Sequence, residues 1–471
     1  MANLIIYILG LCIYNSILFY GKKLGINVIL FVGPLLGFMY YVLKQNKKIN
    51  NKKGLLFMIP IILLSIFYLV YDNTFFKVFN TFIMTILFLL MYLFTINPTF
   101  KISEVFVNVI NLMFLPLSQI SNLYRVVKLK IEDALHLSSN GKQKIKSIFI
   151  VIPIVIIVLL LLSSADMLFS NIFGNFFSLF KKISIGNIID RIILIILLFT
   201  YLGSTINYLL YEYKEKKGNS KKESKIENYT IKLLLTTLNI IYVVFDFIQI
   251  RSLMFHQGLT NINYAEYARS GFFQLMFISI INLSILLISK KSKEDTKYNK
   301  IMSVIMVFLT FIIIVSSFLR MYMYESAYGY TLLRLLVYVT LLTEVILLIP
   351  TLVYIFNSKM NILKPYMIII ISIYTLLSLS PVDYFIAKNN INRFYKTGKI
   401  DVDYLKNYST DNITLLCDLY DNMDDGSGKY SYTRKFLKDY LVYIYNQNKN
   451  NSVREYNFSR RIAIEKLKNY N

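Results

Sequence analysis

Eleven apolar stretches, each about as long as a membrane-spanning helix, recur along this chain of 471 residues. A helix needs roughly 20 mostly apolar residues to cross the hydrocarbon core of a bilayer. Because polar loops separate the stretches, the pattern predicts an all-α polytopic membrane protein of about eleven transmembrane helices. The predicted spans are 4–20, 24–43, 54–71, 75–96, 147–166, 187–210, 229–250, 270–289, 300–319, 331–356 and 365–380.

The composition agrees with this class and argues against a soluble enzyme. Hydrophobic residues make up 56% of the chain and charged residues 17%, whereas soluble domains contain about 45–50% and about 25%. The net charge of +24 could indicate nucleic-acid binding. The lysines concentrate in short loops between spans, however, which is typical of membrane topology. We therefore expect no nucleic-acid partner.

The distribution of basic residues also predicts the orientation. Counted with the first three residues of the next span, the loops that follow the even-numbered predicted spans carry 25 lysines and arginines, and those that follow the odd-numbered spans carry eight. Cytoplasmic loops are the ones enriched in lysine and arginine. We therefore expect a cytoplasmic N-terminus and, with eleven spans, an extracytoplasmic C-terminal segment in the cytoplasmic membrane. Lys22 and Lys23 favour the opposite orientation locally.

The chain is predicted to contain three regions. Residues 1–146 hold four spans and a segment at 102–135 that begins with a stretch too polar for a comfortable span. We interpret 102–120 as interfacial or re-entrant, followed by an amphipathic piece. Residues 147–380 form a membrane core of seven spans. Residues 381–471 are polar, with two amphipathic helical patterns, and predict a small extracytoplasmic helical domain.

Ionisable side chains in or near membrane helices are costly and usually face the bundle or water, which makes them the natural functional candidates. The candidate carboxylates are Asp166, Glu325 and Glu344. The candidate anion- or lipid-binding residues are Arg269, Arg320, Arg334, Tyr267 and Tyr324. Arginine beside tyrosine can hold a phosphate or carboxylate group. The alternative is an aromatic belt with cations that reach the headgroups.

Several motifs resemble uncharacterised bacterial membrane families named as domains of unknown function, of the 4153/4173 type. They are Ala165-Asp166, Tyr267 to Phe273, the run from Tyr324 to Arg334, and the segment from Asp383 through Lys399 to Tyr404. The resemblance covers roughly 145–415 and implies a multi-pass membrane protein. It departs from the expected pattern at Met167 and Phe394. It implies no activity, because none is established for these families.

No nucleotide, metal or nucleophile motif is present, so no catalytic residue, cofactor or metal site is predicted. The chain is interpreted first as a non-catalytic envelope component, a sensor or assembly scaffold with an arginine-rich site at the outer leaflet. The alternatives are a transporter or flippase for an anionic or lipidic solute, and a membrane-embedded transferase on a lipid-linked substrate. Expected partners are membrane lipids, an anionic headgroup or lipid-linked ligand, and envelope proteins that contact the C-terminal tail.

Overall fold

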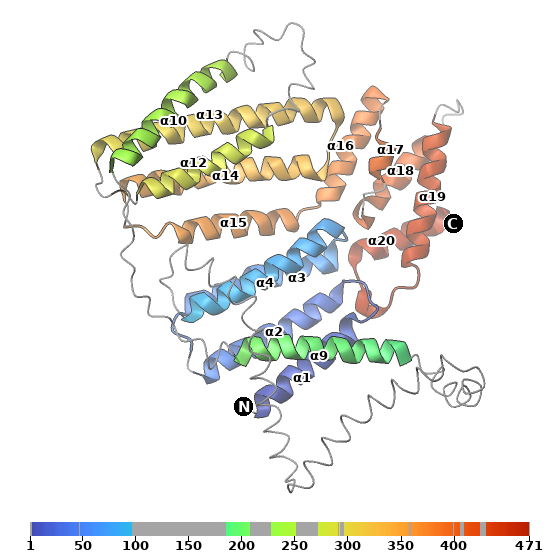
Figure 1. Cartoon of the computed structure of the whole chain (residues 1–471). Coiled ribbons are helices and arrows are strands. Elements are labelled where there is room, and N and C mark those ends of the chain that lie inside the picture. Colours follow the sequence, from blue (N-terminus) through green and yellow to red (C-terminus); the bar gives the residue numbers. More distant parts are fainter. Residues whose placement is uncertain are drawn as a thin grey trace, which may run out of the picture. The chain divides into compact units, whose positions relative to one another are not determined.

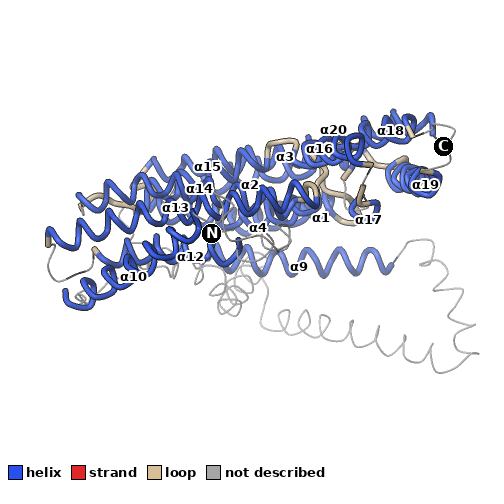
Figure 2. The backbone as a smooth tube through the Cα atoms, turned by 90° about the horizontal axis from the view of Figure 1, so that it is seen from above, coloured by secondary structure: helices blue, strands red, loops and turns tan. Residues whose placement is uncertain are grey.

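The computed structural model describes residues 2–46, 48–96, 185–207, 228–250, 272–290, 292, 296–357, 359–398, 400–405, 409–423 and 430–470. In these ranges the chain forms helices and no strand (Figure 2). Among the described residues, six helices are long and apolar enough to cross a membrane, or seven if one bent pair is a single span. The protein is thus an all-helical, multi-pass membrane protein. The total of eleven spans stays a prediction, and spans such as 147–166 lie outside the described residues.

The chain divides into two compact units. One unit comprises Met1–Leu55 and Leu89–Glu215, and the other comprises Leu56–Phe88 and Lys216–Asn471. The boundary falls inside helix α4 (Thr74–Ile96). The predicted division at 146 and 380 is a different partition and remains a prediction.

The first unit is organised around the contact between α1 (Ala2–Phe19) and α9 (Ile185–Asn207). Ile8 and Cys12 of α1 are buried against α2 (Ile26–Gln45) and α9. Just beyond α1, the Tyr20 hydroxyl donates a hydrogen bond to Asp190 (3.2 Å) near the start of α9. The end of α1 therefore lies beside the beginning of α9, and the two helices are antiparallel.

The second unit contains a membrane bundle in which neighbouring helices pack lengthwise. In Figure 1, α13, α14 and α15 lie side by side, and α12 and α10 also contact α13. The helices are α3 (Met58–Val70), the first part of α4, α10 (Asn228–Gln249), α12 (Phe272–Ser289), α13 (Lys297–Tyr328), α14 (Leu332–Phe356) and α15 (Leu363–Ser378).

Local signals in the sequence define the ends of α13 and α14. Thr296 and Thr331 are N-caps whose hydroxyls accept the backbone N–H of the residue three positions on. Gly329 ends α13 with φ +85°, which favours glycine. α13 has 32 residues and is about 48 Å long at 1.5 Å per residue. It exceeds a hydrocarbon core of about 30 Å, so one or both of its ends extend beyond that core.

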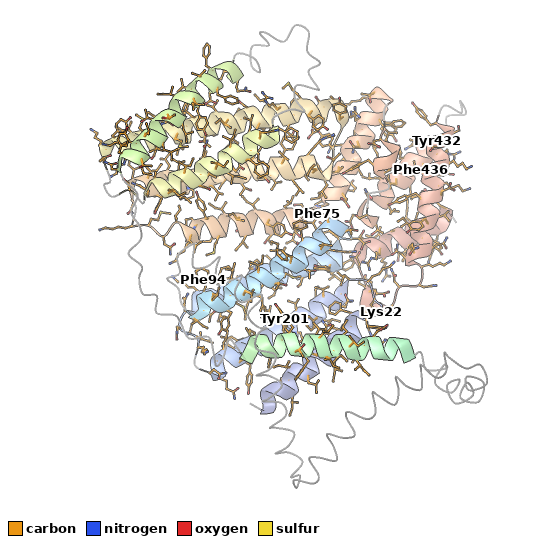
Figure 3. The ribbon with its side chains drawn as sticks, viewed as in Figure 1. Lys22, Phe75, Phe94, Tyr201, Tyr432 and Phe436 are labelled. Atoms are coloured by element: carbon orange, nitrogen blue, oxygen red, sulfur yellow. The ribbon has the colours of Figure 1, made fainter. Side chains whose placement is uncertain are left out.

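The C-terminal helices pack at one end of this bundle (Figure 1). Apolar side chains on two of these helices, Ile413, Leu416, Leu437 and Leu441, are buried, and Tyr432 on α19 is exposed (Figure 3). The elements are α16 (Val382–Thr397), α17 (Val402–Leu405), α18 (Ile413–Asn422), α19 (Ser431–Asn448) and α20 (Phe458–Leu467), with short 3₁₀ turns at Thr410–Asn412, Val453–Glu455 and Lys468–Tyr470.

Candidate functional site

Asp72, in the three-residue link between α3 and α4, is the centre of a largely buried polar cluster. Its carboxylate accepts hydrogen bonds from Arg460 of α20 through Nε (2.7 Å) and pairs with Nη2 (2.6 Å). It also pairs with Lys77 of α4 and accepts the Thr410 hydroxyl (3.0 Å). The Asp72 backbone N–H donates to the Asp411 carboxylate (2.8 Å). A single short link thus contacts two separate C-terminal segments.

Further bonds extend this contact to α16. The Asn73 amide donates to the Asp383 carboxylate (2.6 Å). The Asn457 amide, at the N-cap of α20, donates to the carbonyls of Tyr68 and Tyr71 (2.8 Å each), near the end of α3. We call Asp72, Asn73, Lys77, Asp383, Asp411, Asn457 and Arg460 the Asp72 cluster.

The Asp72 cluster contains three carboxylates and two cations, which has consequences for protonation. Burial raises the pKa of Asp72, but the charges of Lys77 and Arg460 outweigh burial and hold the pKa below its ordinary value. Burial raises the pKa of Asp411 to about 6, and the neighbouring Asp383 and Asp72 add to the increase. Hydrogen bonds from serine side chains oppose this shift. Asp411 therefore titrates closer to neutral pH than an ordinary aspartate.

A second group of side chains surrounds the turn between α13 and α14. The Arg334 guanidinium lies over the Tyr324 ring, 4.3 Å from its centroid. Its Nη1 donates to the Gly329 carbonyl. The Tyr324 ring stacks on Phe272 of α12 with centroids 6.0 Å apart. Two predicted site residues, Arg334 and Tyr324, therefore lie together, and Arg334 contacts groups of its own chain.

Glu325 belongs to the same neighbourhood. It is buried, and its carboxylate interacts with the hydroxyls of Tyr330 and Tyr338 and with the charge of Arg334. Burial and the Glu325 carboxylate raise the pKa of the Tyr330 phenol to about 12. The Tyr330 phenol is thus a neutral donor to the carboxylate at neutral pH.

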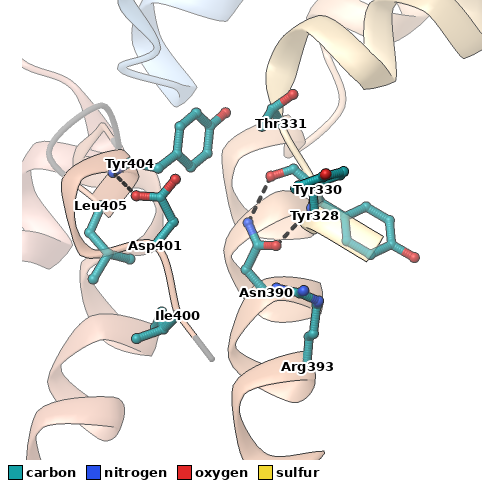
Figure 4. Close-up of a pocket in the computed structure, with 9 residues that line it drawn as sticks. All are labelled: Tyr328, Tyr330, Thr331, Asn390, Arg393, Ile400, Asp401, Tyr404 and Leu405. Carbon is teal, nitrogen blue, oxygen red and sulfur yellow. Dashed lines mark hydrogen bonds between the residues drawn. The ribbon is translucent and has the colours of Figure 1, made fainter. Parts of the chain in front are cut away.

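Beside this turn lies a small pocket of about 20 Å³. The Asn390 side chain of α16 brackets Tyr330, accepting its N–H and donating to its carbonyl (2.8 Å each; Figure 4). Arg393 donates to the Ala327 carbonyl (2.5 Å), and the Leu332 N–H donates to the Tyr404 hydroxyl oxygen (2.8 Å). The lining residues are Tyr328, Tyr330, Thr331, Asn390, Arg393, Ile400, Asp401, Tyr404 and Leu405.

Two other predicted site residues that the structure describes, Arg320 and Glu344, contact partners away from Arg334. Arg320 is buried and donates to Gln249 of α10 (2.9 Å). Glu344 is buried deeper in α14, beside Ser279 of α12. Asp166, Tyr267 and Arg269 lie outside the described residues. Within the described parts of the chain, no group of three or more His, Cys, Asp or Glu residues could hold a metal ion.

Comparison with known proteins gives a family. A family model described as "Domain of unknown function (DUF4153)" matches residues 58–419. The chain belongs to the DUF4153 family. The match confirms the resemblance inferred from the motifs and begins well before residue 145, where the motifs placed its start. No curated protein and no solved structure matches the chain.

The DUF4153 region includes Asp72, Asp383 and Asp411, whereas Arg460 and Asn457 lie beyond it. Sequence reasoning did not select Asp72, Asp411 or Arg460 as functional residues. A weak signal existed, because Asp72-Asn73 interrupts two apolar stretches with a carboxylate and an amide at a membrane boundary. Nothing in residue spacing links position 72 to position 460.

Proposed function

We propose that this protein is a non-catalytic component of the cell envelope, anchored in the cytoplasmic membrane by its apolar helices. Its extracytoplasmic C-terminal helices act as the contact domain for another envelope protein, in assembly or sensing. The observation that carries the proposal is the Asp72 cluster, which fixes these helices on the loop between α3 and α4. A contact domain held this way can transmit force or a binding signal to the membrane helices.

The use of the arginines supports binding over catalysis. Arg334 and Arg393 each donate to a backbone carbonyl of the α13–α14 region, and Arg460 pairs with Asp72. Guanidinium groups held in this way join parts of the fold to one another. Arg334 and Tyr324 remain a candidate contact for an anionic headgroup or a lipid-linked ligand at the edge of the same turn.

The topology supports the predicted orientation. In the first unit, Tyr20 and Asp190 lie at one end. In the second unit, the 71–73 link, the 329–331 turn and the start of α16 lie at one end, where C-terminal helices contact both loops. Tyr20, Asp190, the 71–73 link and the 329–331 turn lie at ends of predicted spans that border loops poor in lysine and arginine, and α16 begins the predicted C-terminal segment. A topology in which successive spans alternate in direction, with an extracytoplasmic C-terminus, is consistent with the shared end in each of the two units.

Exposed apolar side chains on the C-terminal helices provide a surface for a partner. Tyr432 is 78% exposed and Val453 is 87% exposed, and Tyr443 is also exposed. Such side chains are enriched in protein contacts and are costly to leave in water.

The proposal is tested by complementation of a deletion strain under envelope stress. The full chain, a truncation after Ser380, Glu325→Gln and Glu344→Gln are compared at equal membrane levels. We expect the truncation to lose activity and both glutamine variants to keep it. Loss in Glu344→Gln together with lost solute flux in proteoliposomes would instead establish transport. Loss in Glu325→Gln together with lost product from a lipid-linked substrate would establish a transferase.

A second experiment examines the contact surface directly. A photo-cross-linking amino acid replaces Tyr432 or Val453 in cells, and replaces Ile368 of α15 as the control. Ile368 is 66% exposed but lies on an apolar membrane helix. We expect one discrete protein adduct from both C-terminal positions and none from position 368. Adducts at all three positions, or at none, would contradict a specific contact domain.

A further inference from the structure

Glu344 makes a contact in the membrane bundle that is informative about its protonation. Its Oε2 lies 2.5 Å from the Ser279 hydroxyl oxygen of α12. The same hydroxyl lies 2.8 Å from the Met276 carbonyl oxygen. A serine hydroxyl carries one hydrogen and can accept two hydrogen bonds. A separate two-centre hydrogen bond at each contact requires that Ser279 donate to the carbonyl and Glu344 donate to Ser279.

The other carboxyl oxygen leads to the same conclusion. Glu344 is 3% exposed, and its Oε1 has no hydrogen-bond partner among the described residues. An ionised carboxylate would place negative charge on this oxygen without a donor, which is costly in a membrane interior. The carbonyl oxygen of a neutral acid carries no net charge, so burying it without a donor costs much less free energy.

The packed helices offer no counter-charge close by. Lysine, arginine and acidic residues are missing from α12 and from residues 301–319 of α13. On α14 the nearest charged residue is Arg334, ten positions away and about 15 Å along the helix axis. On α15, residues 365–378 contain tyrosines but no charge. On α10 the charged residues are Lys232, near the start of the helix, and Asp246, which is buried.

We propose that Glu344 is a proton-binding site inside the membrane bundle and is a neutral carboxylic acid in the folded protein at neutral pH. The proton lies on Oε2 and is donated to Ser279. The ligand is thus a proton, held between α12 and α14 and shielded from the α13–α14 turn. Release of this proton requires entry of water or a cation into the bundle. The inference does not depend on the proposed contact-domain function.

Infrared spectroscopy of the full chain in lipid vesicles tests this directly. A neutral carboxylic acid has a carbonyl stretch that is distinct from both carboxylate and amide bands and shifts in deuterated water. We expect such a band at pH 7 and its loss in Glu344→Gln, which preserves shape and can still bond to Ser279. The bands of other carboxylic acids, Asp246 included, are the same in the wild type and in Glu344→Gln, so they cancel in the difference spectrum.

Two serine variants provide a second measurement in folded protein. Ser279→Ala removes the acceptor of the Glu344 proton, so the band should move to the frequency of a less strongly bonded acid. Ser284→Ala removes a hydroxyl on the same helix that bonds only the Ile280 carbonyl (3.0 Å) and should leave the band unchanged. The proposal is overturned if wild type and Glu344→Gln give the same spectrum at pH 7. It is also overturned if Ser279→Ala leaves the acid region unaltered.

Discussion

At the scale of single residues, Arg460 and Arg461 are adjacent in sequence yet differ completely in environment. Arg460 is buried and pairs with Asp72, whereas Arg461 pairs with Glu465 at an exposed surface (3.1 Å). Replacing Arg460 with methionine removes one of the two cations that the structure places on Asp72. Removing one partner of a buried pair costs about 3–5 kcal/mol. We expect Arg460→Met to lower the melting temperature in detergent strongly and Arg461→Met to leave it unchanged. Equal melting temperatures would show that the Asp72 pair does not stabilise the fold.

One source of pH dependence in the Asp72 cluster, besides Asp383 with its pKa raised by burial, is Asp411. Its folded-state pKa of about 6 lies above its ordinary value of 3.8, so the fold binds more protons than the unfolded chain between these values. Stability should therefore increase as pH falls from about 6 to about 4 and stay constant above about 6. Asp72 has the opposite sign, because its pKa is lowered, and its contribution is lost on acidification below about 3.8.

We therefore expect a maximum in thermal stability at mildly acidic pH, measured by melting curves from about pH 3 to 8. Asp411→Asn mimics the neutral acid and should flatten the curve between about pH 4 and 6. Asp418→Asn, at an exposed carboxylate that pairs with Lys466, should keep the wild-type slope. A wild-type slope in Asp411→Asn would assign the titration to another group.

At the scale of elements, two glycines that end helices test how tightly the turn after α13 is built. Gly329 has φ +85° and ψ −175°, a region that is essentially restricted to glycine, and an added Cβ would lie 2.7 Å from the Asn390 Oδ1. Gly398 ends α16 at φ +66° and ψ 4°, where an added Cβ meets only the Tyr430 hydroxyl at 3.8 Å.

Asparagine tolerates the conformation of Gly398 but not that of Gly329. We expect Gly398→Asn to preserve the melting temperature. Gly329→Asn should lower it, by strain of about 1–3 kcal/mol and by displacement of Asn390 from Tyr330. Similar melting temperatures for the two variants would mean that the bracket of Asn390 on Tyr330 does not hold in solution.

The elements themselves could be predicted because their signals are local. Apolar stretches long enough to span a membrane gave the helices, and Thr296, Thr331 and Gly329 mark ends that propensity alone explains. Arg334 and Tyr324 were selected from sequence, and the turn at Gly329 brings them together. Arg320 was grouped with them, but it faces α10 and contacts Gln249, because its position on α13 decides which neighbour it meets.

The Asp72 cluster could not be predicted from the sequence. Asp72 and Arg460 are separated by 388 positions, and no periodicity in either segment indicates the other. Their contact arises only when α3, α4 and α20 are packed, which is a property of tertiary structure. Glu344 was selected because a carboxylate in a span is costly, but its partner Ser279 lies on another helix and was likewise invisible in the sequence.

At the scale of the whole molecule, the decisive question is which side of the membrane the C-terminal helices occupy. The native cysteines, Cys12 and Cys417, are both buried, and burial raises the pKa of the Cys417 thiol to about 11. Both should react slowly with a maleimide, because the thiolate is the nucleophile. Maleimide labelling of a single cysteine introduced at an exposed position can therefore be distinguished from the slow labelling of the two native cysteines.

Tyr432→Cys and Lys297→Cys form a matched pair, since both positions are exposed near the start of a helix. Position 432 belongs to the predicted extracytoplasmic segment, and position 297 belongs to a lysine-rich loop predicted to be cytoplasmic. A membrane-impermeant maleimide applied to intact spheroplasts should label only Tyr432→Cys, whereas both variants should be labelled after permeabilisation. Labelling of Lys297→Cys alone would invert the topology and place the Asp72 cluster in the cytoplasm. The contact domain would then face cytoplasmic partners, and its mildly acidic stability optimum would have no bearing on the pH outside the cell.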